Sequence, residues 1–242
     1  MRVRVRFSKT GKLRFISAID LGRVWERALR KANLPVAYSE GFSPHPKVSF
    51  GDALPLGFAS TAEFAEVTFA IPVDLVDMST RLTAAFPEGM AVLDAVEVVD
   101  GDRRLGKLLQ ASLWTFTYGA PDGLAEAVAA LPPDGPLTTR RERKGEMVTV
   151  DVRPALVGVI AAGPTIRAVL HHPGFIPDDD RVEGPAVRAD DVPAVLGLPD
   201  PPHITTRTAQ GRVSEQPRGI ADALRETTTP LDEPVSERTI NE

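Results

Sequence analysis

The order of hydrophobic periodicities over the first hundred residues is the feature that restricts the fold most. Residues 2–7 alternate strictly, with valines and a phenylalanine on one face and arginines on the other. This period of two predicts a half-buried strand whose exposed face is a row of guanidinium groups. From Asp20 to Ala32 apolar residues recur at helical spacing, and Pro35 follows shortly after them. A helix that ends before the proline is therefore expected.

The remaining segments of this half complete a recognisable order of elements. Residues 63–71 predict a strand that is buried on both sides or carries a bulge. Residues 74–86 predict a second helix and residues 90–99 a further strand, while short extended pieces flank the loop around residues 39–50. The resulting order is strand, helix, strand, strand, helix, strand. That order is the ferredoxin-like βαββαβ plan.

The second half repeats this plan less clearly. Its expected elements are a strand at 112–118, a helix at 123–131, a hairpin turning at 144–146, strands at 164–171 and 203–208, and a helix at 190–196. After position 209 the chain has no aromatic residue and is rich in Thr, Ser, Glu and Pro, which is typical of disorder. We expect an α+β chain with a duplicated ferredoxin-like plan. Its predicted parts are a ferredoxin-like domain with a basic face at 1–100, a divergent second copy at 108–208 and a disordered tail at 209–242.

Composition excludes several classes of function. The chain has no cysteine, so it can form no disulfide, thiolate metal site, cysteine nucleophile or iron–sulfur cluster of its own. It contains no apolar run of 18 residues, and its first residues lack the apolar core of a signal peptide. We therefore expect a cytoplasmic chain without membrane contact.

The charge is distributed unevenly along the chain. Residues 1–50 contain eleven Lys or Arg and three acidic residues, a net charge of +8, although the whole chain carries −5. Such asymmetry indicates a localised anion-binding face. The alternative is a solvated basic face that complements the acidic remainder of the same chain.

A proline-rich loop lies at the end of this basic segment. In the stretch 39–50, Pro44 and Pro46 hold the residues before them, Ser43 and His45, in extended geometry. Rigidly presented loops often carry functional residues, and here a hydroxyl, an imidazole and an ammonium stand beside Phe42. An ordinary turn that crosses between strands is the alternative.

These side chains could hold a polyanion such as single-stranded or folded RNA, with cations for the phosphates and aromatic rings for the bases. Ser43 and His45 are the only catalytic candidates, and they are weak ones because no acidic residue accompanies them in sequence. His171 and His172 are neighbours that point apart, so we expect neither a metal site nor a cofactor. The predicted nucleic-acid contacts are Arg4, Arg6, Lys9, Lys12, Arg14, Arg23, Arg27, Tyr38, Phe42, Ser43, His45 and Lys47.

Three runs of sequence resemble a known family. They are residues 7–21 (FSKTGKLRFISAIDL), residues 27–30 (RALR) and residues 34–50 (LPVAYSEGFSPHPKVSF), with ALPLG at 53–57. They are similar to the radical-SAM-linked domain of unknown function, which occurs fused to radical-SAM proteins or as a separate chain. The resemblance is dense over 1–100, thinner over 110–208 and absent beyond. The chain departs from the family at Ala18, where histidine is usual.

The resemblance implies an accessory protein that acts with a radical-SAM enzyme, in a context related to RNA. The cluster-binding CxxxCxxC motif is missing, so any radical chemistry belongs to the partner. Our first hypothesis is an RNA-binding accessory protein for modification or processing of tRNA or rRNA. The second is an RNA-cleaving or RNA-modifying enzyme with His45 as acid or base, and the third is a protein-binding subunit without nucleic-acid contact. The sequence favours a non-enzymatic role.

Overall fold

The computed structural model describes residues 1–120, 122–176, 185–198, 200–225 and 227–232. Within these residues the chain divides into two compact units. Unit 1 comprises residues 1–109 and 223–225, and unit 2 comprises residues 110–222 and 227–232. Each unit combines strands and helices, so the expected mixed α+β class is confirmed, with strands predominating. No helix among the described residues is both long and apolar enough to cross a bilayer.

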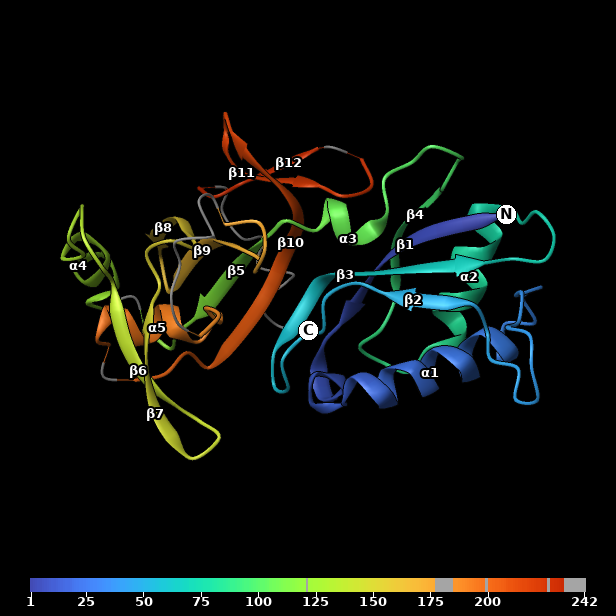
Figure 1. Cartoon of the computed structure of the whole chain (residues 1–242), viewed down its shortest axis with the longest axis horizontal. Coiled ribbons are helices and arrows are strands. Elements are labelled where there is room, and N and C mark those ends of the chain that lie inside the picture. Colours follow the sequence, from blue (N-terminus) through green and yellow to red (C-terminus); the bar gives the residue numbers. More distant parts are fainter. Residues whose placement is uncertain (121, 177–184, 199, 226, 233–242) are drawn as a thin grey trace. The chain divides into compact units, whose positions relative to one another are not determined.

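Unit 1 contains one antiparallel sheet in the order β4-β1-β3-β2. Strand β1 lies between β3 and β4, and Figure 1 shows β2 beside β3. The chain order of strands and long helices in this unit is the one predicted from the periodicities. Its elements are β1 (Arg2–Lys9), the 3₁₀ helix η1 (Gly11–Phe15), α1 (Ala18–Lys31), β2 (Val48–Phe50), β3 (Ala59–Thr68), α2 (Leu75–Ala85), β4 (Val92–Glu97) and the short helix α3 (Leu105–Leu108).

Helix α1 begins directly after Ser17, a residue type that is favoured at helix N-caps. Ser17 Oγ accepts a hydrogen bond from the Asp20 backbone N–H at 3.1 Å, and the Ser17 hydroxyl donates to the Asp20 carboxylate at 2.8 Å. This arrangement satisfies one of the free N–H groups of the first turn. The hydrogen bond from Ser17 is also the main reason why the pKa of Asp20 lies below its usual value.

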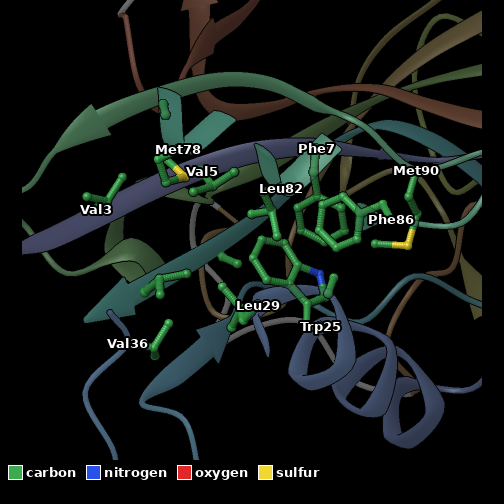
Figure 2. Packing of buried hydrophobic residues seen from close by; sticks show 14 of the residues in the cluster. Val3, Val5, Phe7, Trp25, Leu29, Val36, Met78, Leu82, Phe86 and Met90 are labelled. Carbon is green, nitrogen blue, oxygen red and sulfur yellow. The ribbon is translucent and has the colours of Figure 1, made fainter. Parts of the chain in front are cut away.

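The core of unit 1 is built around Trp25 of α1 (Figure 2). Its indole is fully buried and meets Phe7 and Phe86 edge-on, each with ring centroids 5.0 Å apart. Phe50 of β2 makes a similar contact at 5.7 Å. Edge-to-face geometry is favourable for aromatic pairs beyond the area they bury. Trp25 therefore joins α1 to β1, to β2 and to the end of α2.

Unit 2 also contains an antiparallel sheet, in the order β10-β5-β9-β8. Strand β11 pairs with β10 and with β12, and β6 and β7 form a separate two-stranded ribbon. Its elements are β5 (Ala111–Thr117), α4 (Leu124–Ala129), β6 (Thr138–Arg143), β7 (Glu146–Asp151), β8 (Leu156–Ala162), β9 (Thr165–His171), α5 (Asp191–Leu196), β10 (Ile204–Glu215), β11 (Arg218–Asp222) and β12 (Thr228–Pro230).

The β6–β7 ribbon turns where the sequence predicts it. Lys144 and Gly145 both have positive φ, at 53° and 85°, as the tightest hairpin turns require. The ribbon is held to α5 by an ion pair between Arg141 and Asp191, with Nε and Oδ1 3.0 Å apart. Burial raises the pKa of the Asp191 carboxyl, against the opposing effects of the Arg188 backbone N–H and of Arg141.

The predicted disordered tail is wrong for residues 209–225 and 227–232. Strand β10 continues to Glu215, and β11 and β12 follow it. Ala209 and Ile220 are buried in an apolar cluster with Leu231. The lack of aromatic residues suggested that this segment has no core, but its aliphatic residues provide one. Residues 233–242 of the predicted tail lie outside the described residues. Strand β8 and helix α3 were not predicted.

Candidate functional site

The predicted exposed row of arginines on β1 is wrong for Arg4. Only 4% of this residue is exposed, and its guanidinium forms an ion pair with Glu66 of β3 at 2.5 Å. It also donates to the carbonyl of Arg103 at 2.9 Å. The face of β1 that the alternation assigned to solvent is covered by residues near α3, in the segment that the sequence suggested was a boundary. Arg4 is therefore occupied inside the protein.

Three more predicted cations are also engaged within unit 1. Lys9 is 2% exposed, and its ammonium donates to the carbonyl of Ile16 at 3.1 Å. Arg6 is half-buried and donates to the Thr61 carbonyl at 2.9 Å. Arg14 is half-buried as well, with its guanidinium carbon 4.7 Å from the centre of the Phe15 ring. These side chains thus make contacts within the protein that stabilise the fold.

The loop from residue 38 to residue 47 is closed at its base by backbone hydrogen bonds. Tyr38 forms a β-bridge with Pro46, and Ser39 and His45 exchange two hydrogen bonds, one through the Ser39 hydroxyl at 3.0 Å. At the tip, Gly41 has φ of 121° and Phe42 is fully exposed. The predicted stiffness of this loop thus has a structural basis in both prolines and hydrogen bonds.

His45 lies against helix α1. Its Nδ1 is 3.4 Å from a carboxylate oxygen of Glu26, and both side chains are substantially exposed. Arg23, Glu26 and Arg30 follow one another at i, i+3 and i+7, so they form one stripe on the outer side of the helix. The structure therefore brings His45 together with this stripe. We call the α1–loop surface the set Arg23, Glu26, Arg30, Tyr38, Phe42 and His45.

Other predicted contacts are exposed but lie elsewhere in unit 1. Arg27 is about 100° around the helix axis from Glu26, on the other side of the stripe. Lys47 alternates with Val48, which packs on the helix-covered face of the sheet, so its side chain points toward the opposite face. Lys12 is exposed on η1, and Ser43 is exposed near the tip of the loop. The basic patch predicted from the sequence therefore contains fewer of these residues in the structure.

Two small residues and one glutamate follow one flank of α1. Ala18, Gly22 and Glu26 are spaced at i, i+4 and i+8, and we call this row the α1 flank. A Cβ added to Gly22 would meet no atom within 4 Å. Glycine inside a helix costs roughly 0.5–1 kcal/mol relative to alanine. Packing within the protein therefore does not require a glycine at this position, and alanine there would stabilise the helix.

At the Ala18 end of the α1 flank is a cavity of about 70 Å³. Lys9 and Glu63 line it, and both are less than 5% exposed. Phe50, the last residue of β2, and Asp52, which follows the strand, also line the cavity. Buried charged groups rarely add stability compared with apolar residues of the same size, whereas they are common in binding sites. This cavity is therefore an enclosed candidate site in unit 1.

Sequence reasoning missed three residues of this region. Gly22 carried a usable signal, since it interrupts a helical pattern. Glu63 and Glu26 carried none, because the contact of each with its surroundings depends on how distant segments pack. The position at which the sequence departs from the resembled family, Ala18, lines the cavity.

Unit 2 contains a serine–histidine pair that the sequence did not reveal. The Ser112 hydroxyl and His172 Nε2 are 2.6 Å apart. Ser112 is fully buried, so it cannot meet a substrate, and the pair is structural. Burial, followed by the charge of His172, lowers the pKa of His171. Among the described residues, no group of three or more His, Asp or Glu could hold a metal ion.

Comparison with protein families now adds an assignment. Residues 2–173 match the family described as an uncharacterized protein conserved in bacteria, DUF2344. The chain belongs to the DUF2344 family. No curated protein matches it. The matched region of this DUF2344 chain includes the α1–loop surface, the α1 flank and the cavity.

The buried pair of this DUF2344 chain yields a first prediction. Glu66→Ala is expected to lower the free energy of unfolding by roughly 3–5 kcal/mol, because it leaves the Arg4 charge buried without its carboxylate. Denaturant titration followed by circular dichroism measures the change. The control is Glu97→Ala on β4, an exposed position where a change within about 0.5 kcal/mol is expected. If the two variants lost the same free energy of unfolding, the ion pair with Glu66 would not hold Arg4, and Arg4 would again be a cation available to a ligand.

Proposed function

We propose that this protein binds single-stranded or looped RNA through the α1–loop surface. The observation that carries the proposal is the full exposure of Phe42 at the tip of a hydrogen-bonded loop that meets an arginine-bearing helix face. An exposed ring on a rigid loop is suited to stacking on an unpaired base, and the arginines are suited to the flanking phosphates. Leaving a phenylalanine in water contributes nothing to the fold.

The electrostatic part of this interface is modest. The exposed cations of α1 are Arg23, Arg27, Arg30 and Lys31, but Asp20 and Glu26 lie on the same helix and Asp20 pairs with Arg23 at 3.2 Å. Three phosphate contacts are a reasonable footprint. For single strands, three contacts correspond to a loss of affinity of roughly 20-fold between 50 and 200 mM salt. Stacking must therefore supply a large share of the binding.

We further propose that the protein acts with a radical-SAM enzyme, in modification or processing of tRNA or rRNA. The resemblance of residues 7–50 to the radical-SAM-linked domain supports this, and the absence of cysteine assigns the cluster to the partner. We also infer that both units are versions of the ferredoxin-like plan. The strand orders β4-β1-β3-β2 and β10-β5-β9-β8 support that inference, with the β6–β7 ribbon as an insertion in the second.

Removal of the exposed ring tests the stacking. Phe42→Ala is expected to weaken binding of tRNA or rRNA fragments by roughly 5- to 150-fold, the loss of one stacked base, with no change in unfolding. Arg30→Glu should weaken binding and flatten its salt dependence. Fluorescence anisotropy at two salt concentrations measures both effects. Val76→Ala, an exposed apolar residue of α2, and Arg143→Glu on the β6–β7 ribbon are the controls. Affinity that is unchanged by all four variants would refute RNA binding at this surface.

Purification from the native host tests the partnership. After crosslinking, the wild-type protein is expected to co-purify with a radical-SAM protein and with RNA. The Phe42→Ala variant should still co-purify with the radical-SAM protein but no longer with the RNA. Recovery of the radical-SAM protein without RNA from the wild type would favour a protein-binding subunit. Recovery of neither would contradict both proposals.

The contact between His45 and Glu26 favours a second candidate function, cleavage or modification of the bound RNA. A carboxylate beside an imidazole can orient it for proton transfer, and such general acid–base catalysis is worth about 10²–10⁴ in rate. If the protein cleaves RNA, His45→Ala should lower the rate by that factor and Glu26→Gln by less, while Ser43→Ala stays near wild type. The rate is measured on the RNA found by crosslinking. Full activity of His45→Ala would remove the enzymatic hypothesis.

A further inference from the structure

The α1 flank connects the two parts of unit 1 that the proposed RNA interface leaves unexplained. At one end, Glu26 meets His45 of the loop. At the other end, Ala18 lines the cavity together with Phe50. Between them, Gly22 leaves open space where any other residue would place a side chain. Eight residues of helix separate the two ends, which is roughly 12 Å, or three to four nucleotides of a stacked strand at about 3.4 Å each.

The segment from the loop to β2 follows the same flank. His45 contacts Glu26, and five residues later Phe50 contacts Trp25 and lines the cavity. Phe50 is still 37% exposed, so its ring is partly available to a ligand. Glu26, Gly22 and Ala18 thus lie at successive turns of one helix face between the exposed loop and the cavity.

The size of the cavity restricts what can enter it. Its volume of about 70 Å³ exceeds the 10–15 Å³ that a water molecule needs, but it is well below the 300–1,000 Å³ typical of pockets for whole small molecules. A single planar group attached to a larger ligand fits this description. The aromatic wall formed by Phe50 is suited to the face of such a group.

The polar groups of the cavity restrict the chemistry further. Lys9 supplies donors, whereas Glu63 and Asp52 supply acceptors. An ammonium has three donors and an ionised carboxylate about four acceptor sites, so these groups can bind a ligand while keeping their partners in the protein. The edge of guanine has one carbonyl acceptor beside two nitrogen donors, which matches one ammonium and two carboxylates. Uracil, with one donor between two acceptors, matches less well.

We propose that an RNA strand crosses the α1 flank over Gly22 and that a guanine base enters the cavity beside Lys9, Glu63 and Asp52. This inference rests on the proposed RNA binding and assigns it a base preference. The backbone of the strand lies closest to α1 at Gly22. The base stacks against Phe50, and its carbonyl faces the ammonium.

Two substitutions close this path without touching the buried charges. Ala18→Leu fills the mouth of the cavity, and Gly22→Ala places a methyl group on the flank. Both are expected to lower the affinity for the pentanucleotide UUGUU at least tenfold, toward that of UUUUU, while Gly22→Ala raises thermal stability. Ala84→Leu on α2 and Gly106→Ala, a helical glycine of α3 that also has open space around it, are the matched controls. Asp52→Asn should reduce the guanine preference alone.

A second measurement separates the inference from the proposed function. Guanosine monophosphate is expected to shift the NMR signals of residues around Ala18 and Phe50 in the wild type but not in Ala18→Leu. Uridine monophosphate should shift these signals in neither protein. If Phe42→Ala weakens RNA binding but Ala18→Leu and Gly22→Ala behave as their controls do, the guanine site is refuted and RNA binding stands. If no RNA binds and guanosine monophosphate shifts no signal, both are refuted. If guanosine monophosphate shifts these signals although no RNA binds, the cavity is a guanine site and the RNA interface is refuted.

Discussion

The register of β1 against β3 is the constraint on which unit 1 depends. Val5 lies opposite Ala65, and Arg4 lies opposite Glu66. Because side chains alternate, a slip by one residue would turn the apolar set away from Trp25 and the arginines into the core. The same register places Glu63 opposite Phe7, at the wall of the cavity. One pairing therefore determines the core, the buried Arg4–Glu66 ion pair and the acidic side of the candidate base site.

Local patterns were sufficient to predict most elements of the chain. The alternation of β1, the capped start of α1 and the Lys144-Gly145 turn each depend on residues that are close in sequence, so each could be predicted. The two-sided burial expected for residues 63–71 is also observed, with Phe64 on one face and Val67 on the other. The extent of β10 could not be predicted in the same way. Its polar and small residues become a strand because neighbouring strands pair with both of its edges, and that is a tertiary effect.

The candidate site was less predictable than the fold, because charge in a sequence does not reveal where the charge is used. Arg4 and Lys9 belong to the basic first segment, yet the structure buries both. A residue on the outer face of a strand is exposed only if nothing covers that face. Here residues around Leu105 and Leu109 cover it together with Phe64. The arginines of α1 remain exposed because the helix already uses its opposite face to bury Trp25. The exposed basic surface is therefore formed by the helix. The net charge of +8 for residues 1–50 overstates how much positive charge is exposed.

Three features of unit 1 depart from what stability alone favours, and they lie along one path. Phe42 exposes an aromatic ring, Gly22 weakens the middle of a helix, and Lys9 and Glu63 place ionisable groups where apolar ones would pack. Natural sequences are mostly consistent across local and tertiary levels, and their departures concentrate where function requires them. If these departures were incidental, they would have no reason to follow one helix flank from a loop to a cavity. Their alignment is the physical basis for assigning a ligand to this surface in preference to the more basic but buried strand.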